Sequence, residues 1–305
     1  MIRFSSGTPQ PADEALGSAA SIQRRRVVIT GVTGTLGEAL ARTYQARGFE
    51  VVGISHRAGA VSSCCDRILR SAQASESDAN HLLDLDPDIL ILNAGRIETS
   101  VGPDGVPLAE ATCDIFSLNA IFPALVVAAA GARGATRRLD IVAIGSIADG
   151  SPSCFGPVYH ASKTALHSFI TGAGPIVNAA HRLVRVRLYR PGVIQGQLSW
   201  APLLRLNERG ASIRARRCRN APEARVIAER IARWIDADAW VGSEPAPLSF
   251  RALALLHAVA PDFYYRLQRL AWKRGSRFGA RAGIERAEMG TARAVHPSIQ
   301  PETRA

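Results

Sequence analysis

Residues 27–37 join a short apolar run to a glycine-rich turn. Val27-Val28-Ile29-Thr30 has the composition of a buried parallel strand. Gly31-Val32-Thr33-Gly34-Thr35-Leu36-Gly37 follows directly, and a helix is predicted over residues 38–47, where Gly48 ends it. Glycine allows a tight turn and a close approach of backbone to a ligand, and a helix start offers free N–H groups. The segment therefore predicts a strand–turn–helix unit that can bind a phosphate group, with an ordinary glycine turn as the alternative.

Strands and helices continue to alternate after this unit. Apolar runs predict strands at 50–55, 88–92, 139–144 and 183–189, with a short third strand near 61–65, and helices are predicted over 109–130, 158–181 and 222–236. We expect a bend near Pro123, and an interruption or kink at Gly172, Gly174 and Pro175. Such alternation forms right-handed βαβ units. The predicted fold class is α/β, a Rossmann-type doubly wound parallel sheet in a single domain with a C-terminal helical extension.

The composition of the chain changes outside this alternating region. Residues 1–24 are rich in Ser, Gly, Ala and Pro and are expected to form a disordered tail, as are residues 283–305. Residues 25–245 are expected to form the nucleotide-binding domain. Residues 246–282 are expected to form a basic amphipathic helical extension.

The chain is strongly basic, with a formal net charge of +11 and 47% hydrophobic residues. The composition is that of a globular protein, and the charge indicates either a nucleic-acid or anionic-membrane surface or a set of anionic ligands. The basic residues are spread along the chain, and neither zinc-finger spacing nor an RNA-recognition signature is present. We therefore expect no nucleic-acid partner.

Five cysteines occur without Cys-x-x-Cys or Cys/His metal spacing, which predicts no metal site and no disulfide scaffold. The start lacks a signal-peptide pattern, and no apolar run reaches the ~20 residues that span a bilayer. The apolar stretch 120–132 is interpreted as a buried helix. These features predict a cytoplasmic protein, with peripheral contact on the inner face of the membrane as a further hypothesis.

The ends of two further predicted strands carry residues suited to a dinucleotide. Ile54-Ser55-His56-Arg57 contains no acidic residue that could bind a ribose 2′-hydroxyl, whereas Arg57 suits a 2′-phosphate. Asn93-Ala94-Gly95 offers small residues at a strand end, where backbone can approach a ligand. Arg57 as a solvated loop residue and a plain turn at 93–95 are the alternatives.

Lys163 and Lys273 are the two lysines of a chain whose other basic side chains are arginines and histidines. Lys163 lies four residues after Tyr159, so the two side chains share one face of a helix. A phenol and a compact ammonium on one face form a plausible acid/base pair. Taken alone, the spacing favours the alternative, a half-buried tyrosine beside a surface lysine.

Further polar residues stand in register with this pair. Ser146 follows a predicted strand and precedes Tyr159, and Asn119 is a polar residue within an apolar helix. Together with the glycine turn, 93–95 and Pro191-Gly192, this arrangement resembles the short-chain dehydrogenase/reductase family in its standard single-domain branch. The resemblance covers about residues 26–240.

The resemblance implies a role for each member of the catalytic set. Tyr159 would be the general acid in reduction and the base in oxidation. Lys163 would hold the nicotinamide ribose and lower the pKa of Tyr159, Ser146 would hydrogen-bond the substrate carbonyl, and Asn119 would fix a water in a proton relay. The predicted cofactor is NADP(H), with NAD(H) as the alternative. Its binding residues would be Gly31, Thr33, Gly34, Leu36, Gly37, Arg57, Asn93, Ala94, Gly95, Tyr159, Lys163, Pro191, Gly192 and Ile194.

The chain departs from the family pattern at several positions. Thr35 stands where the family usually has glycine, and the resulting glycine spacing is closer to the sugar-nucleotide epimerase/dehydratase branch. Leu92 replaces the first asparagine of the usual Asn-Asn-Ala-Gly. Gly196 replaces a threonine expected to grip the nicotinamide carboxamide. Asp66 is our choice for the adenine-contacting acid that often follows the third strand in the family.

The C-terminal third is expected to shape the substrate site. Residues 193–220 would form a substrate loop whose apolar residues (Trp200, Leu203, Leu204, Leu206) precede arginines (Arg214, Arg216, Arg217, Arg219), which favours a hydrophobic or anionic substrate; a solvated lid is the alternative. Residues 250–274 combine aromatic and basic side chains that could lie on an anionic membrane, or pack on the domain or on a partner subunit.

We therefore expect an NADP(H)-dependent enzyme that acts on a small carbonyl or alcohol substrate, assembled as a homodimer or homotetramer. A sugar-nucleotide epimerase or dehydratase and a non-catalytic nucleotide-sensing relative are the alternatives.

Overall fold

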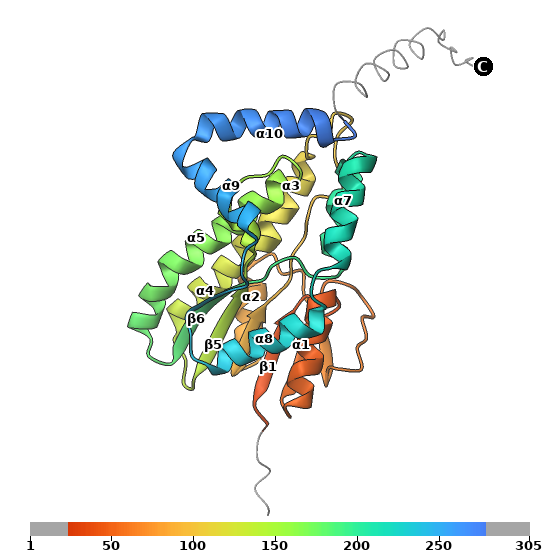
Figure 1. Cartoon of the computed structure of the whole chain (residues 1–305). Coiled ribbons are helices and arrows are strands. Elements are labelled where there is room, and N and C mark those ends of the chain that lie inside the picture. The colour runs from red at the N-terminus through yellow and green to blue at the C-terminus, as the bar shows by residue number, and fades with distance from the viewer. Residues whose placement is uncertain (1–23, 279–305) are drawn as a thin grey trace, which may run out of the picture.

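A seven-stranded parallel sheet forms the centre of the protein (Figure 1). The computed structural model describes residues 24–278, and the strand order is β3-β2-β1-β4-β5-β6-β7. The strands are β1 Arg26–Thr30, β2 Glu50–Ser55, β3 Arg67–Arg70, β4 Ile89–Leu92, β5 Leu139–Ile144, β6 Val184–Arg190 and β7 Val241–Ser243. The predicted doubly wound sheet is confirmed. Strand order reverses between β1 and β4, which is where ligands bind in such sheets.

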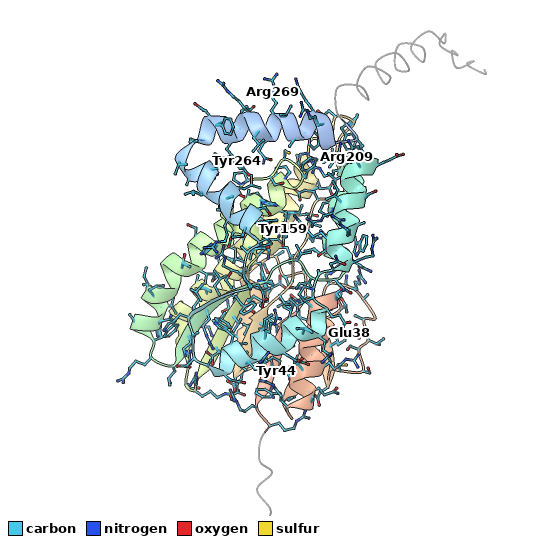
Figure 2. The ribbon with its side chains drawn as sticks, in the orientation of Figure 1. Glu38, Tyr44, Tyr159, Arg209, Tyr264 and Arg269 are labelled. Atoms are coloured by element: carbon cyan, nitrogen blue, oxygen red, sulfur yellow. The ribbon has the colours of Figure 1, made fainter. Side chains whose placement is uncertain are left out.

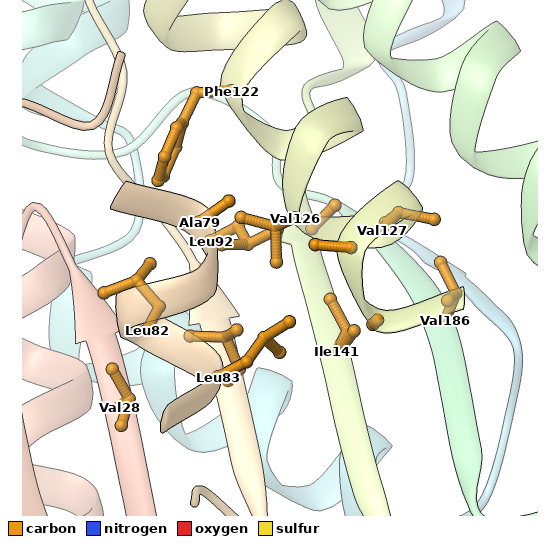
Figure 3. Packing of buried hydrophobic residues seen from close by; sticks show 14 of the residues in the cluster. Val28, Ala79, Leu82, Leu83, Leu92, Phe122, Val126, Val127, Ile141 and Val186 are labelled. Carbon is orange, nitrogen blue, oxygen red and sulfur yellow. The ribbon is translucent and has the colours of Figure 1, made fainter. Parts of the chain in front are cut away.

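Helices cover both faces of the sheet. α1 Thr35–Ala46 and α8 Ala224–Asp236 pack on one face, and α2 Glu76–Asp84, α4 Phe122–Arg133 and α5 Pro157–Ala180 pack on the other. Alternate strand residues enter the two cores, as Val27 and Val28 do. Figure 3 shows the core between the sheet and helices α2, α4 and α5, where α2 and α4 residues meet Val28 and Ile141.

The helix before β5 contains a widened turn. α3 Ala109–Phe116 runs into the π-helical turn η1 Ser117–Ile121, and α4 follows with Pro123 in its first turn. The irregularity is therefore at η1, just before the predicted bend. By length and composition 109–133 could cross a membrane, but 50% of its most apolar window is buried. Its packing against the sheet, α2 and α5 identifies it as a core helix.

Two predictions about local structure are wrong. The third strand is β3 at 67–70, and Val61 in the predicted 61–65 segment is exposed. α5 is continuous from 157 to 180, so the predicted interruption is absent, and Pro175 lies on its exposed side. Gly174 faces inward against β6, where an added β-carbon would lie 3.5 Å from the Val186 carbonyl oxygen, an ordinary packing distance.

Residues 193–220 are more ordered than a loop. They contain the short helix α6 Gln197–Trp200, the 3₁₀ segment η3 Ala201–Arg205 and α7 Glu208–Arg219. The Asn207 side chain accepts a hydrogen bond from Gly210 N at 3.0 Å and so caps α7. A further 3₁₀ segment, η2 Ile147–Gly150, follows β5.

The C-terminal extension consists of two helices, α9 Leu248–Val259 and α10 Pro261–Gly275. The chain turns between them at Ala260 and Pro261, so the single helix predicted over 250–274 is divided. One face of α10 packs on the domain, because the Tyr264 hydroxyl donates to the Pro152 carbonyl at 2.5 Å and Cys154 N donates to Gln268 Oε1 at 2.9 Å. The predicted tails lie almost wholly outside the described residues, as do residues 279–282 of the predicted extension.

Candidate active site

A cleft of about 930 Å³ opens beyond the carboxyl ends of the strands. It is lined by nearly all the residues proposed from the sequence: Gly31, Thr33, Gly34, Leu36, Gly37, Arg57, Asn93, Ala94, Gly95, Ser146, Tyr159, Lys163, Pro191, Gly192 and Ile194. Among the predicted catalytic and cofactor-binding residues, Asn119 alone does not line it. Tyr159 lies between the sheet and the helical extension (Figure 2). These residues come from six separate segments of sequence and meet in one cavity.

The glycine turn is packed so tightly that side chains cannot replace two of its glycines. Gly31 has a φ of +65°, and an added β-carbon would lie 2.8 Å from the Ala94 Cα. A β-carbon on Gly37 would lie 2.2 Å from the Gly31 carbonyl oxygen. This packing brings the start of α1 to the cleft, where its free N–H groups suit an anionic ligand.

The loop after β4 is tied to the end of β1. The Thr30 hydroxyl accepts hydrogen bonds from the N–H groups of Asn93 and Ala94, both at 3.0 Å, and the Asn93 amide donates to the Thr30 carbonyl. Gly95 follows, and a β-carbon there would lie 3.3 Å from Asn119 Oδ1 and 3.7 Å from Lys163 Nζ. The predicted small residues therefore allow a close approach of the catalytic candidates to this loop.

Asn119 is fully buried within η1. Its Oδ1 accepts from Arg96 N at 2.8 Å, and its Nδ2 donates to the Arg96 carbonyl and to Ser162 Oγ, both at 2.9 Å. The side chain thus joins the loop after β4 to α5. Its predicted function in a proton relay stays a prediction.

Ser146, Tyr159 and Lys163 surround the inner part of the cleft. Ser146 Oγ accepts from Ala148 N at 3.1 Å, which leaves the hydroxyl proton available to another acceptor. Lys163 Nζ lies 5.9 Å from the centre of the Tyr159 ring and donates to the Ile144 carbonyl at 2.9 Å. The predicted shared face of α5 is present, and the ammonium is held by the end of β5.

Burial controls the titration of both groups. It raises the pKa of the Tyr159 phenol, opposed by a hydrogen bond with Ser146 and by the charge of Arg214, and assisted by the charges of Asp149 and Glu98. This direction is opposite to the predicted lowering by Lys163. Burial lowers the pKa of Lys163 to about 8, and Asp149 acts in the other direction. The phenol is therefore protonated at neutral pH.

The outer end of the cleft contains residues that the sequence did not reveal. Arg57 is exposed and lines the cleft together with Arg70, the last residue of β3. Gln73 also lines it and is 3% exposed, and its Oε1 has no hydrogen-bond partner within residues 24–278. Asp66 is a wrong choice for the adenine site: it precedes β3, accepts from Val51 N at 2.8 Å and does not line the cleft. Because the third strand was predicted at 61–65, Arg70 and Gln73, which lie at and after the actual end of β3, were not predicted as cleft residues.

The substrate end is formed by loops and the helical extension. Phe155, Leu198 and Phe250 provide apolar surface, while His160 and Arg214 provide polar groups. His160 Nδ1 lies 2.8 Å from the Ser151 carbonyl, and burial lowers the pKa of His160. Trp200 and Leu206, which were expected in an apolar wall, do not line the cleft. Phe250 belongs to α9, and no local signal associates it with the catalytic residues.

A family model described as short chain dehydrogenase matches residues 25–202. Among solved structures, the fold is similar to a short chain dehydrogenase from Burkholderia cenocepacia in complex with NADP, at 17% identity and a TM-score of 0.59 over 80% of this chain and 98% of that one. A short chain dehydrogenase/reductase from Burkholderia phymatum in complex with NAD gives 18% identity and a TM-score of 0.65 over 80% and 96%. The 3-oxoacyl-[acyl-carrier protein] reductase from Brucella melitensis in complex with NAD gives 20% and 0.58 over 73% and 96%. No curated protein matches the chain.

Proposed function

The chain belongs to the short-chain dehydrogenase family, and from that premise we propose that it is an NADP(H)-dependent oxidoreductase acting on a carbonyl or alcohol substrate. The observation that carries the proposal is the single cleft in which the glycine turn meets Ser146, Tyr159 and Lys163. Binding of a dinucleotide needs the glycine turn, and proton transfer needs the three polar side chains. When bound, the nicotinamide supplies or accepts the hydride.

The residues of the cleft fit such a cofactor. The tight packing at Gly31 and Gly37 leaves room for a pyrophosphate at the start of α1. The unpartnered Oε1 of Gln73 can accept from the adenine amino group. Lys163 would hold the nicotinamide ribose, with Pro191, Gly192 and Ile194 beside the nicotinamide.

A preference for NADP(H) rests on two arginines. Arg57 and Arg70 line the end of the cleft beyond β2 and β3, and guanidinium groups suit a 2′-phosphate. The similar structures bind both kinds of cofactor, with NADPH in the dehydrogenase from Sphingobium yanoikuyae and NAD in that from Burkholderia phymatum. Arg57 and Arg70 favour the phosphorylated form, and NAD(H) is the alternative.

Tyr159 would act as the general acid in reduction. Its raised pKa keeps the phenol protonated, so it can donate a proton to the carbonyl oxygen as hydride arrives. The Ser146 hydroxyl would donate a hydrogen bond to the same oxygen and stabilise the developing alkoxide. Asn119 would support a proton relay, since it connects the loop after β4 to α5.

Replacement of Tyr159 by phenylalanine tests this mechanism. Tyr159→Phe keeps the ring but removes the proton, so reduction should fall by ~10²–10⁴-fold. NADPH binding, measured by fluorescence titration, should be nearly unchanged. The substrate comes from a carbonyl screen read by NADPH oxidation. Full activity of Tyr159→Phe on that substrate would refute the proposed acid.

The net consumption of NADPH distinguishes the proposed reductase from the two alternative functions. A reductase consumes one NADPH per product, an epimerase or dehydratase returns its cofactor at the end of each turnover, and a sensor binds NADPH without product. The glycine spacing at Gly31, Gly34 and Gly37 motivates the epimerase. The presence of Ser146, Tyr159 and Lys163 in the cleft with the glycine turn favours turnover over sensing.

Partners beyond the substrate remain predictions. Phe263 and Tyr265 on α10 are 60% and 71% exposed, beside basic Arg266 and Arg269. This outward face supports either a second copy of the chain or an anionic membrane as partner. Light scattering tests the homodimer or homotetramer. Liposome flotation with and without residues 247–282 tests the membrane contact.

A further inference from the structure

Arg214 of α7 supplies a cation to the substrate end of the cleft. It is half-buried and lines the same cavity as Tyr159. Its Nε and Nη2 both lie 3.3 Å from the Ser199 carbonyl, at the end of the segment that follows Pro191 and Gly192. This two-point contact orients one edge of the guanidinium and leaves its remaining N–H groups for another acceptor.

No acidic side chain neutralises Arg214 within residues 24–278. Two acids line the cleft, and both already have partners. Asp78 accepts from the Ser71 and Ser75 hydroxyls, at 2.7 and 2.8 Å, and Asp114 pairs with Arg96 at 2.9 Å. The positive charge of Arg214 is therefore available to a ligand.

The charge acts near the reacting groups. It opposes the rise in the Tyr159 pKa that burial causes, and it adds to the lowering of the His160 pKa by burial; both residues line the cleft. Arg217, the second arginine after Arg214 on the same helix, lies with its guanidinium 5.5 Å from the ring centre of Phe250. That contact joins α7 to α9, the first helix of the C-terminal extension.

Apolar side chains line the same cleft as this cation. Phe155, Leu198 and Phe250 line the substrate end, and Phe250 reaches it from the extension. A ligand that fills this space has an apolar body and an anionic group. Guanidinium binds carboxylate in a planar, two-bond arrangement, which makes it specific as well as strong.

We propose that Arg214 binds a carboxylate of the substrate, so that the cleft selects oxo acids with an apolar chain over neutral carbonyl compounds. The inference rests on the proposed function, because Tyr159 is taken to protonate the carbonyl of the same molecule. Arg214 acts as a specificity residue, and its effect appears as a difference between charged and neutral forms of one compound.

The test uses oxo-octanoates that differ in the position of the ketone, each paired with its methyl ester. NADPH oxidation gives kcat/KM for the wild type, Arg214→Gln and Arg214→Lys. Hydrogen bonds to charged groups contribute ~1.5–3 kcal/mol, so Arg214→Gln should reduce kcat/KM for the preferred acid by roughly 10–100-fold. The ester should change little. Arg214→Lys should recover part of the loss. Arg216→Gln, an exposed neighbour on α7, is the matched control and should leave both unchanged.

Three results would overturn the inference. The first is a wild type that prefers no oxo acid over its ester. The second is an equal loss for acid and ester in Arg214→Gln. The third is weakened NADPH binding in that variant by fluorescence titration, which would assign Arg214 to the cofactor. Tighter binding of the matching alkyl phosphate than of the carboxylate would overturn the choice of carboxylate.

Calorimetry with octanoate and methyl octanoate on the NADPH-saturated protein separates this inference from the proposed function. Arg214-dependent binding of octanoate without reduction of any oxo acid would refute the proposed reaction and support the anion site. Reduction of carbonyl compounds with no Arg214-dependent preference would support the reaction and refute the site.

Discussion

Gly196 packs directly against Thr35, because a β-carbon on Gly196 would lie 2.9 Å from Thr35 Oγ1 and 3.0 Å from Thr35 Cβ. These two positions are the ones where the chain exchanges glycine and threonine relative to the family pattern. Both line the cleft at the start of α1. Thr35 therefore places a hydroxyl beside position 196, and we expect the two departures to compensate in space.

A double-mutant cycle tests this compensation. Gly196→Thr alone should overpack the contact and destabilise the protein by ~1–3 kcal/mol. Combining it with Thr35→Gly should recover much of that loss, with a coupling of ~0.5–3 kcal/mol. Urea unfolding gives the free energies and fluorescence titration gives NADPH affinity. Strictly additive effects would show that the two residues are independent.

Glu98 holds the start of α5 from outside the helix. Its Oε1 accepts from Val158 N at 2.5 Å and from Tyr159 N at 3.1 Å, and the side chain is 2% exposed. Glu98→Ala should leave these N–H groups without a partner, costing ~1–3 kcal/mol of unfolding free energy and reducing kcat. Glu98→Gln keeps an acceptor oxygen and should retain most of the stability.

Glu98→Gln also separates the effect of the Glu98 charge from the effect of its hydrogen bonds to the start of α5. The negative charge of Glu98 raises the pKa of Tyr159, so Glu98→Gln should move the alkaline decline of the reduction rate to lower pH. The exposed Glu110→Gln in the first turn of α3 is the control. An unchanged pH–rate profile in Glu98→Gln would contradict the electrostatic effect.

Lys163 should make stability depend on alkaline pH. Burial lowers its pKa to about 8 from a value of 10.5, so below pH 8 both folded and unfolded states are charged. Between about pH 8 and 10.5 the folded protein loses this proton while the unfolded chain keeps it. The unfolded state then binds more protons, and the contribution of Lys163 to stability rises with pH.

The comparison is between the wild type and Lys163→Met in urea unfolding at several pH values. The difference in unfolding free energy, wild type minus variant, should increase through this window. Lys273→Met is the matched control, because Lys273 is exposed and pays no burial cost. A pH-independent difference for Lys163→Met would show that burial does not lower the pKa of Lys163 in the folded protein.

Arg57 and Arg70 should determine the choice of cofactor. Arg57→Gln and Arg70→Gln each remove a charged donor from the end of the cleft, so NADPH affinity should fall by roughly 10–100-fold while NADH affinity changes little. Arg67→Gln, at the other end of β3, is the control. Equal losses of affinity for NADPH and NADH would show that Arg57 and Arg70 do not bind the 2′-phosphate.

The local pattern of the chain was sufficient for the sheet and the inner site. Apolar runs such as 27–30 and 139–144 define buried strands, and parallel strands all end at one edge of the sheet. A glycine turn, Ser146 and the Tyr159–Lys163 spacing must then face a common cleft. These features depend on neighbours a few residues away, and periodicity reports them.

Other relationships depend on how distant segments pack. Gly196 against Thr35, Glu98 beneath α5 and Phe250 in the cleft with Arg214 join residues far apart in the chain. Their side chains meet because the course of each loop and the docking of α7, α9 and α10 place them together. Such long-range contacts cannot be inferred from composition or periodicity, so only the tertiary structure determined them.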